Sequence, residues 1–454
     1  MCRISTLSVF LVGMAAQAAV AQGPCGSWEQ VATPNPGLER NGFIDADADG
    51  GPVFALLRST DQPGSAAPAT YHMLRRDTGG WTDLGEPDRN AGPGIPVWLA
   101  SAAAPDGRVW VGGKMQPDPF ALSEPAVSVL DPDTGVWSTP ENIPLMAQTG
   151  DPFADRGGTI TAMDAAPDGT LFAVGNATGF GGAGDVTVPM FLMNDGGGWI
   201  EVADPAFDWP GGGVGAGIAM NDVLALAPDD VWAVGRHPAG DGIGAGGLLI
   251  HWDGSSLSLV EDPRVGGVLF IDRELGGIDA TGPDDIWAVG DGSAAGGPTV
   301  TLAHFDGSDW TLAPSPYPTV DALDHVVMAS DGSTWTTGVF ADAQEAYMDG
   351  SGWTLQPFAP VPQTRIQAMA RDADGVLWAF GDVAPADSYA QSLDCTSPHC
   401  PADLNGDGVL DLNDIQAFVD GFLTQDPIAD LNGDGVLDLT DVNLFVTAFL
   451  NGCT

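Results

Sequence analysis

Residues 228–232 read Pro-Asp-Asp-Val-Trp, and residues 283–287 repeat the same unit as Pro-Asp-Asp-Ile-Trp. In each copy a Pro-Asp turn is followed at once by a short apolar strand that carries an aromatic residue. The unit occurs seven times in all, with its other copies at 49–54, 105–110, 167–172, 331–335 and 374–378. Self-similarity at a regular interval, here about 50 residues, is the sequence sign of a repeat architecture.

A second motif is an Asp-Gly turn that leads to a tryptophan, as in Asp306-Gly-Ser-Asp-Trp310. It occurs six times after residue 50, once with leucine in the last place, at 77–81, 133–137, 195–199, 253–257, 306–310 and 349–353. The seventh repeat has no copy of its own, but Cys25-Gly-Ser-Trp28 supplies one near the other end of the chain. This arrangement predicts a last repeat that is split between the two ends.

The two motifs together predict an all-β body, a seven-bladed β-propeller over residues 22–395. About 50 residues suffice for four strands and their turns, and the N-terminal strand closes the ring by completing the last blade. The 63 glycines and 36 prolines indicate many turns, and 44% hydrophobic residues are enough for a large core. The tryptophans are expected to pack between strands, and the Asp-Gly groups are expected to form turns.

The last part of the chain contains one acidic loop twice. Asp403-Leu-Asn405-Gly-Asp407-Gly-Val-Leu-Asp411-Leu-Asn-Asp414 recurs 27 positions later in the stretch 430–441. Carboxylates and an amide at loop positions 1, 3, 5, 9 and 12, with glycine at position 6, have the spacing that wraps a loop around Ca²⁺. Position 7 would add a backbone carbonyl, from Val409 and Val436.

An apolar stripe follows each loop at helical spacing, through Ile415 and Phe418 in the first copy and through Val442 and Phe445 in the second. We expect these two stripes to bury each other. A duplicated loop with an exit helix resembles a type I dockerin, a small α-helical docking module that binds two Ca²⁺ ions. The resemblance covers about residues 400–454, behind a short linker at 396–399. It implies these side-chain ligands: Asp403, Asn405, Asp407, Asp411, Asp414, Asp430, Asn432, Asp434, Asp438 and Asp441.

The resemblance also implies a partner for the module, a cohesin-like or cell-surface protein. Loop positions 10 and 11, which help to select the partner in dockerins, are Leu412-Asn413 and Leu439-Thr440. The hydroxyl pair often present there is incomplete. The Gly452-Cys453 ending resembles a subgroup of dockerin-tailed surface proteins in which the module is thought to be an anchor.

The first 21 residues have the features of a secretory signal peptide. Arg3 provides a positive start, Leu7–Ala16 is apolar, and Ala19-Val20-Ala21 fits the cleavage rule. The expected location is therefore extracellular or attached to the cell surface, without membrane insertion. A net charge of −47 argues against nucleic acid as a partner, because like charges repel.

Four cysteines remain once Cys2 is assigned to the signal peptide, and three pairings are possible. The repeat alignment places Cys25 and Cys395 at the same turn of the split blade, so we expect these two to form a disulfide. Cys400 and Cys453 would then clasp the ends of the calcium-binding module. The alternative keeps Cys453 for an intermolecular or anchoring bond.

No catalytic constellation is recognisable: the sequence has no Gly-x-Ser-x-Gly, no His-Glu-x-x-His and no phosphate loop. His251 and His304 occupy equivalent places in two repeats and are expected to be repeat residues. Arginine is scarce, yet six lie in the connections that lead into a new blade: Arg40, Arg89, Arg156, Arg264, Arg273 and Arg365. Such guanidinium groups could bind the carboxylate or sulfate of an acidic glycan, or could only neutralise nearby aspartates.

Three functional hypotheses follow. The first is a secreted or surface-attached protein whose propeller is a binding platform, possible ligands including polysaccharide, and whose calcium-dependent module docks or anchors it. The second is a propeller-type polysaccharide lyase or glycoside hydrolase delivered by its dockerin. The third is a structural envelope protein.

Overall fold

The computed structural model forms two compact units, one over Gly23–Ser397 and the other including Pro398–Thr454. The described residues run from 28 to 451 with these gaps: 35–39, 49–50, 61–68, 78–79, 88–94, 117–121, 133, 144, 146–155, 182–183, 203–218, 238–245, 262–273, 292–299, 315–322, 330–331, 339–343, 350–351, 358–363, 384–386, 395–401, 403, 405–409, 411, 425–428, 430 and 432–436. All four cysteines of the predicted disulfides lie outside the described residues.

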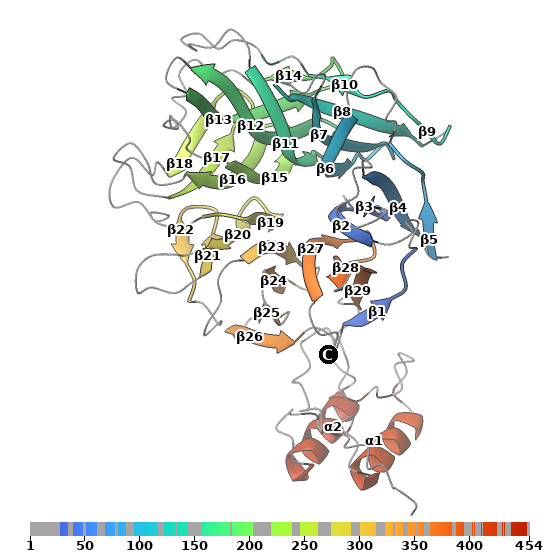
Figure 1. Cartoon of the computed structure of the whole chain (residues 1–454). Helices are drawn as coiled ribbons and strands as arrows, with labels where there is room; N and C mark the ends of the chain where they lie inside the picture. Colours follow the sequence, from blue (N-terminus) through green and yellow to red (C-terminus); the bar gives the residue numbers. More distant parts are fainter. Residues whose placement is uncertain are drawn as a thin grey trace, which may run out of the picture. The chain divides into compact units, whose positions relative to one another are not determined.

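The larger unit is a seven-bladed β-propeller, as the repeats predict (Figure 1). Its seven sheets are antiparallel, and six of them use strands that follow one another in the chain. Blade 1 contains β2 (Arg40–Asp47), β3 (Val53–Thr60), β4 (Thr70–Asp77) and β5 (Gly80–Asp83). Blade 2 contains β6 (Ile95–Ala103), β7 (Val109–Gln116), β8 (Glu124–Asp131), β9 (Val136–Trp137) and β10 (Glu141–Asn142). Blade 3 contains β11 (Arg156–Ala165), β12 (Leu171–Gly181), β13 (Gly184–Asn194) and β14 (Ile200–Glu201).

The remaining blades repeat this plan. Blade 4 contains β15 (Ala219–Ala227), β16 (Asp230–His237), β17 (Gly246–Trp252) and β18 (Leu257–Glu261). Blade 5 contains β19 (Gly277–Gly282), β20 (Asp285–Asp291), β21 (Val300–Phe305) and β22 (Trp310–Leu312). Blade 6 contains β23 (Leu323–Met328), β24 (Thr334–Gly338), β25 (Gln344–Asp349) and β26 (Gly352–Pro357). Blade 7 contains β27 (Thr364–Arg371), β28 (Val376–Val383), β29 (Asp387–Asp394) and β1 (Glu29–Val31).

Blade 7 takes its outer strand from the N-terminal region. β1 pairs antiparallel with β29, with Glu29 opposite Ser392 and Val31 opposite Ala390. Beyond the strand, the hydroxyls of Thr33 and Ser388 lie 3.0 Å apart.

The core lies between the blades, in seven apolar clusters that each join two neighbouring sheets around the ring. The aromatic residues of the first motif begin the second strands, where all seven are buried: Phe54, Trp110, Phe172, Trp232, Trp287, Trp335 and Trp378. Burial at these positions explains why the motif always carries a large aromatic side chain.

The tryptophans of the second motif pack against the first motif of the preceding blade. Trp310 of blade 5 meets Trp232 of blade 4 in a T-shaped pair, with ring centroids 5.8 Å apart. The same edge-to-face arrangement recurs in the pairs Trp199–Trp110, Trp353–Trp287 and Trp81–Trp378. Trp28 forms it with Trp335 at 6.0 Å. Trp28 therefore occupies in blade 7 the place that the motif tryptophan holds in other blades.

Three glycines of the second strands lie where no larger residue would fit. Gly113, Gly175 and Gly235 each lie opposite an irregular step of the inner strand, where one extra residue bulges out of the ladder. A Cβ at any of these glycines would overlap a backbone carbonyl oxygen of that inner strand. The glycine that ends the repeated Ala-Val-Gly sequence therefore permits the bulge beside it.

We expect Gly235→Ala to destabilise the propeller by about 3 kcal/mol, because the new methyl group would overlap the Ala219 carbonyl and only backbone movement can relieve the overlap. Denaturant unfolding followed by tryptophan fluorescence measures this loss. Gly42→Ala is the matched control, since its Cβ would lie 3.9 Å from Asp382 Cβ, an ordinary contact. Equal stability of the two variants would contradict the steric explanation.

The smaller unit contains two helices, α1 (Leu412–Thr424) and α2 (Leu439–Asn451) (Figure 1). Phe418 of α1 stacks on Phe445 of α2 with ring centroids 4.3 Å apart. Small and branched residues from the loops complete this core: Ala402, Leu404, Leu410, Ala429, Leu431 and Leu437. No helix of the described residues is long and apolar enough to cross a membrane.

The prediction that the two apolar stripes bury each other holds for the phenylalanines and is wrong for the outer residues of each stripe. The buried face of α1 passes through Asp414, Phe418 and Gly421. Leu423 continues the helical spacing of the stripe eight positions after Ile415, yet it is 75% exposed, and the equivalent Leu450 is 77% exposed. The loops contribute half of the core, so each helix turns toward its own loop and leaves one side of the stripe in solvent.

Candidate functional site

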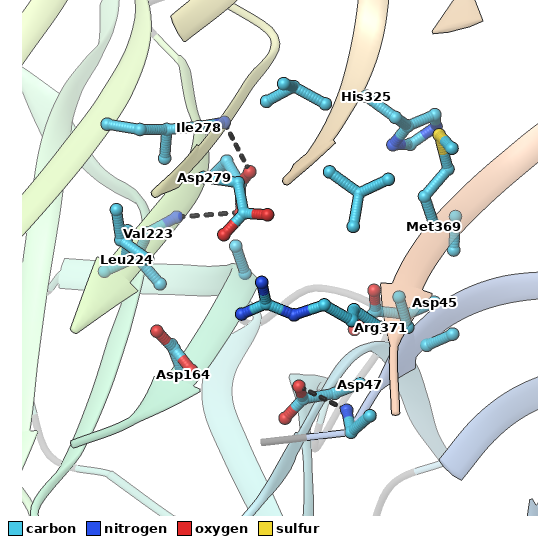
Figure 2. A pocket seen from close by; sticks show the side chains of 18 of the residues that line it. Asp45, Asp47, Asp164, Val223, Leu224, Ile278, Asp279, His325, Met369 and Arg371 are labelled. Carbon is cyan, nitrogen blue, oxygen red and sulfur yellow. Dashed lines mark hydrogen bonds between the residues drawn. The ribbon is translucent and has the colours of Figure 1, made fainter. Parts of the chain in front are cut away.

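The seven inner strands of the propeller surround a cavity of about 750 Å³ (Figure 2). Every inner strand contributes to its lining, including the bulged positions. The lining residues at these irregular steps are Ile44, Leu99, Thr161, Asn221, Asp324 and Gln367. The bulge that the glycines permit therefore places an additional residue at the wall of this channel.

Five aspartates in the channel fasten one blade to the next. Asp164 Oδ1 accepts a hydrogen bond from its own neighbour, Ala165 N, at 2.8 Å, and its Oδ2 accepts one from Ala225 N of blade 4 at 2.6 Å. Asp222 does the same for blades 4 and 5, through Val223 N and Ile278 N, both at 2.9 Å. We call these carboxyl groups the channel carboxyls: Asp45, Asp47, Asp164, Asp222 and Asp279.

The channel carboxyls occupy two levels of the inner strands. Asp47, Asp164 and Asp279 lie opposite the first-motif aromatic of the second strand. Asp45 lies two residues earlier, at the level that Asp222 holds in blade 4. Each carboxyl reaches the backbone N–H one residue further along the next inner strand, as Asp279 does with Met328 N at 2.7 Å. The repeated geometry places these groups without any matching sequence motif.

Burial dominates the electrostatics of the channel. It raises the pKa of Asp45 to about 7, although N–H donors such as that of Ser101 oppose the shift. Burial also raises the pKa of Asp222 to about 7. The pKa of Asp279 rises to about 6 for the same reason, while the Met328 N–H and the Arg371 guanidinium lower it. Loss of solvation disfavours the ionised form of these carboxyls, and the backbone N–H donors of the next blade act in the opposite direction.

Arg371 is the one arginine or lysine among the described lining residues. Its Nη1 donates a hydrogen bond to Met328 O at 2.9 Å, and this contact joins blade 7 to blade 6. Figure 2 shows the side chain extending across the cavity toward Asp279. The guanidinium therefore acts as a local counter-charge and as a further link between blades.

The channel carboxyls are engaged by backbone donors, which leaves them poorly placed to act as a nucleophile or base. Both oxygens of Asp47, Asp164, Asp222 and Asp279 accept a backbone N–H. Across the described part of the chain, no three His, Cys, Asp or Glu side chains are grouped to hold a metal ion. The observed hydrogen bonds of these carboxyls join neighbouring blades around the channel.

The predicted arginines are only partly described. Arg40 and Arg156 are the first residues of β2 and β11, and Arg365 is the second residue of β27. All three thus stand at the start of an inner strand and not in the connection that precedes it. Arg89, Arg264 and Arg273 lie outside the described residues.

Sequence reasoning missed the channel carboxyls and Arg371. The available signal was an aspartate seven or eight positions before the strand aromatic, as in Asp164–Phe172 and Asp279–Trp287. With 61 acidic residues in the chain, such a spacing does not stand out. Only the strand register shows which aspartates face the next blade.

The two repeated histidines do occupy equivalent places. His251 pairs with Trp232 across the strands, and its Nε2 lies 2.8 Å from Asp230 Oδ1. His304 has the same relation to Trp287 and Asp285, with an equal distance of 2.8 Å. The His304 ring stacks on Trp287, and the His251 ring lies tilted against Trp232 with centroids 4.2 Å apart, so these residues stabilise their blades.

In the smaller unit, the predicted calcium ligands that the structure describes are Asp414, Asp438 and Asp441. Asp414 and Asp441, the last positions of the two loops, are completely buried. Asp441 Oδ1 accepts a hydrogen bond from Leu431 N at 3.0 Å, and its Oδ2 accepts one from Asp438 N at 2.8 Å, so the carboxylate faces its own loop. The remaining predicted ligands lie outside the described residues.

No protein-family model matches this sequence, and no curated protein matches it either. Among solved structures, a streptogramin B lyase is similar at a TM-score of 0.46 and 13% identity, over 81% of this chain and 97% of that one. A fungal alcohol oxidase in complex with copper is similar at a TM-score of 0.49 and 15% identity, over 84% and 78%. The β-propeller domain of the Trilobed protease from Pyrococcus furiosus is similar at 0.46 and 13%, over 78% and 94%. With TM-scores below 0.5, these similarities carry no inference about what this chain binds.

Proposed function

We propose that this chain is an exported binding protein with two parts. The propeller is the binding platform, its ring closed by the N-terminal strand. The C-terminal unit is a dockerin-like module that folds around two Ca²⁺ ions and docks or anchors the protein. The observation that carries the proposal is the complete burial of Asp414 and Asp441 in a module without basic residues.

Buried carboxylates need a cation, and residues 400–454 contain ten aspartates but no lysine or arginine. The charge must therefore be balanced from outside the module or removed by protonation. The loop spacing supplies oxygen ligands in the number and order that Ca²⁺ prefers. Two equivalent carboxylates, one at the end of each loop, support two ions.

The outer side of the helices supports docking to a protein. Large apolar side chains remain exposed at equivalent positions of α1 and α2, in the pairs Leu412 and Leu439, Val419 and Val446, and Leu423 and Leu450. A monomeric module of this size rarely leaves so many apolar groups in water. Because the module is also acidic, the complementary surface is apolar at its centre and basic at its edge. A cohesin-like or cell-surface protein with such a surface is the proposed partner.

For the propeller, the proposed ligand is a polysaccharide, and in particular one with acidic groups. Arg40, Arg156 and Arg365 begin inner strands at the same end of the channel, and the planar guanidinium group is suited to carboxylate and sulfate. The proposal includes export by the N-terminal signal, which brings the chain to extracellular glycans.

The test uses the whole mature chain and a panel of neutral, uronate-rich and sulfated polysaccharides. We expect retention on an acidic polymer without new chain ends, and weaker retention of the Arg40→Gln, Arg156→Gln, Arg365→Gln triple variant. Arg75→Gln is the control, because Arg75 lies in a third strand and pairs with Asp77 at 3.0 Å. Released chain ends would instead identify a lyase or hydrolase. No response to any polymer would contradict glycan binding and favour a structural role.

A further inference from the structure

Two polar side chains are buried in the seam between blades 6 and 7 without a partner from the protein. Gln391 of β29 is 0% exposed, and neither its Oε1 nor its Nε2 has a hydrogen-bond partner in the chain. Thr337 of β24 is also 0% exposed, and its Oγ1 has no partner in the chain either. Nearly all buried polar groups of folded proteins bond to the protein or to ordered water, because an unpaired group is costly.

The strand registers place both side chains on the same seam. Thr337 lies two residues after Trp335, and alternate residues of a strand point to the same face. Trp335 belongs to the apolar cluster that joins blades 6 and 7. Gln391 lies directly opposite Ala379 and two residues before Leu393, and both of these belong to that cluster. The hydroxyl and the amide therefore face one seam from its two sides.

The polar pair is particular to this seam and is not a feature of the repeat. Gln391 stands opposite the residue that follows the first-motif aromatic, where the other blades carry Leu74, Ser128, Leu192, Ile250, Ala303 and Ala346. The one other polar residue at this place, Ser128, donates a hydrogen bond to Ser138 O at 2.8 Å. Thr337 stands two residues after the aromatic, where the other blades carry Leu56, Gly112, Val174, Val234, Val289 and Phe380.

Blade 6 also differs from other blades in its inner strand. Asp47, Asp164 and Asp279 lie opposite the first-motif aromatic and accept a backbone N–H of the next blade. In blade 6 this place is taken by Val327, which lies opposite Trp335. A valine side chain accepts no hydrogen bond, so blade 6 has no carboxyl link to blade 7 at this level.

We propose that ordered water in this seam bonds to the Gln391 amide and the Thr337 hydroxyl and so joins blades 6 and 7. The amide offers both a donor and an acceptor. A cation cannot accept a hydrogen bond from Nε2, and a simple anion cannot donate one to Oε1, whereas water does both. Buried water with two to four polar partners is a stable part of folded proteins. The proposal is independent of calcium and of any glycan ligand.

Gln391→Met tests whether the amide is hydrated, because it keeps the length of the side chain and removes its hydrogen-bonding groups. A hydrated amide loses bonds in this variant, so we expect the unfolding constant of the propeller to rise about tenfold. An unbonded amide predicts the opposite sign, since its removal would relieve the cost of burying it. An unfolding constant equal to or below that of the unaltered chain would overturn the proposal.

Denaturant unfolding of the whole chain, followed by tryptophan fluorescence, measures this constant, since all 14 tryptophans lie between residues 28 and 378. Gln30→Met is the matched control. Gln30 lies directly opposite Gln391 in the neighbouring strand β1, yet it is exposed. The same substitution there should change the unfolding constant by no more than about twofold.

Thr337→Val tests whether the two side chains share their water. It replaces the hydroxyl by a methyl group of similar size, and its effect should be smaller in the Gln391→Met background than in the unaltered chain. The structure gives no direct hydrogen bond between the two side chains, so such coupling requires a group between them. Effects that multiply exactly in the double variant would contradict a shared site.

A crystal structure of the unaltered protein is the direct test and needs no variant. We expect electron density for water within hydrogen-bond distance of the Gln391 amide and of Thr337 Oγ1. Clear density for both side chains with no water beside either would exclude the proposal, even if Gln391→Met failed to fold.

Discussion

Removal of Ca²⁺ should melt α1 and α2 while the propeller stays folded. The carboxylates of Asp414 and Asp441 are completely buried, and without a cation they would repel each loop's other acids. Calcium at 100 times its dissociation constant would stabilise the module by about 2.7 kcal/mol per site. The described helices are confined to this module, so helical circular dichroism reports it, whereas the tryptophans report the propeller.

The measurement is a titration of the chelated whole chain with Ca²⁺, followed by both signals. Helical dichroism should rise with calcium, and tryptophan fluorescence should not change. Asp441→Ala should shift the rise to much higher calcium, because it removes a proposed ligand and the acceptor of Leu431 N. Asp420→Asn, on the exposed side of α1, is the control. If the helix content changes neither with chelator nor with calcium, the dockerin interpretation is contradicted.

Trp28→Ala should lower the stability of the propeller by about 3–5 kcal/mol, the usual cost of deleting a large buried aromatic side chain. Trp28 is 5% exposed, and its ring meets that of Trp335 edge to face. The pair also holds β1 in blade 7, so its loss should free the strand that we propose closes the ring. Unfolding by denaturant, followed by tryptophan fluorescence, gives the free energy.

Glu29→Ala provides the comparison within the same short strand. Glu29 is exposed, and a change there should alter the free energy of unfolding by no more than about 0.5 kcal/mol. If Trp28→Ala were as stable as Glu29→Ala, β1 would contribute nothing to the ring.

The propeller could be predicted because its information is local and repeated. Trp232 and Trp287 follow Pro-Asp turns in one short stretch each, and seven copies identify seven second strands. The role of Trp28 was also predictable, since its turn matches those before Trp310 and Trp353. Short motifs of this kind recur because every blade must bury the same two faces.

The channel could not be predicted, because its contacts connect residues far apart in the chain. Asp164 and Ala225 N are 61 positions apart, and nothing near Asp164 indicates that it reaches another blade. The exposed side of α1 was missed for a related reason. The stripe through Leu423 has the right periodicity, but Ala402 and Ala429 from the loops decide which way the helix faces.

The channel carboxyls all bond forward, from one blade to the next blade of the ring. Asp164 reaches forward to blade 4, Asp222 to blade 5 and Asp279 to blade 6. Head-to-tail contacts of this kind have no natural end, and only the angle between successive units decides whether they close. An added repeat between blades 3 and 6 could therefore keep this contact at its new interfaces. The number of blades is then set by closure of the ring.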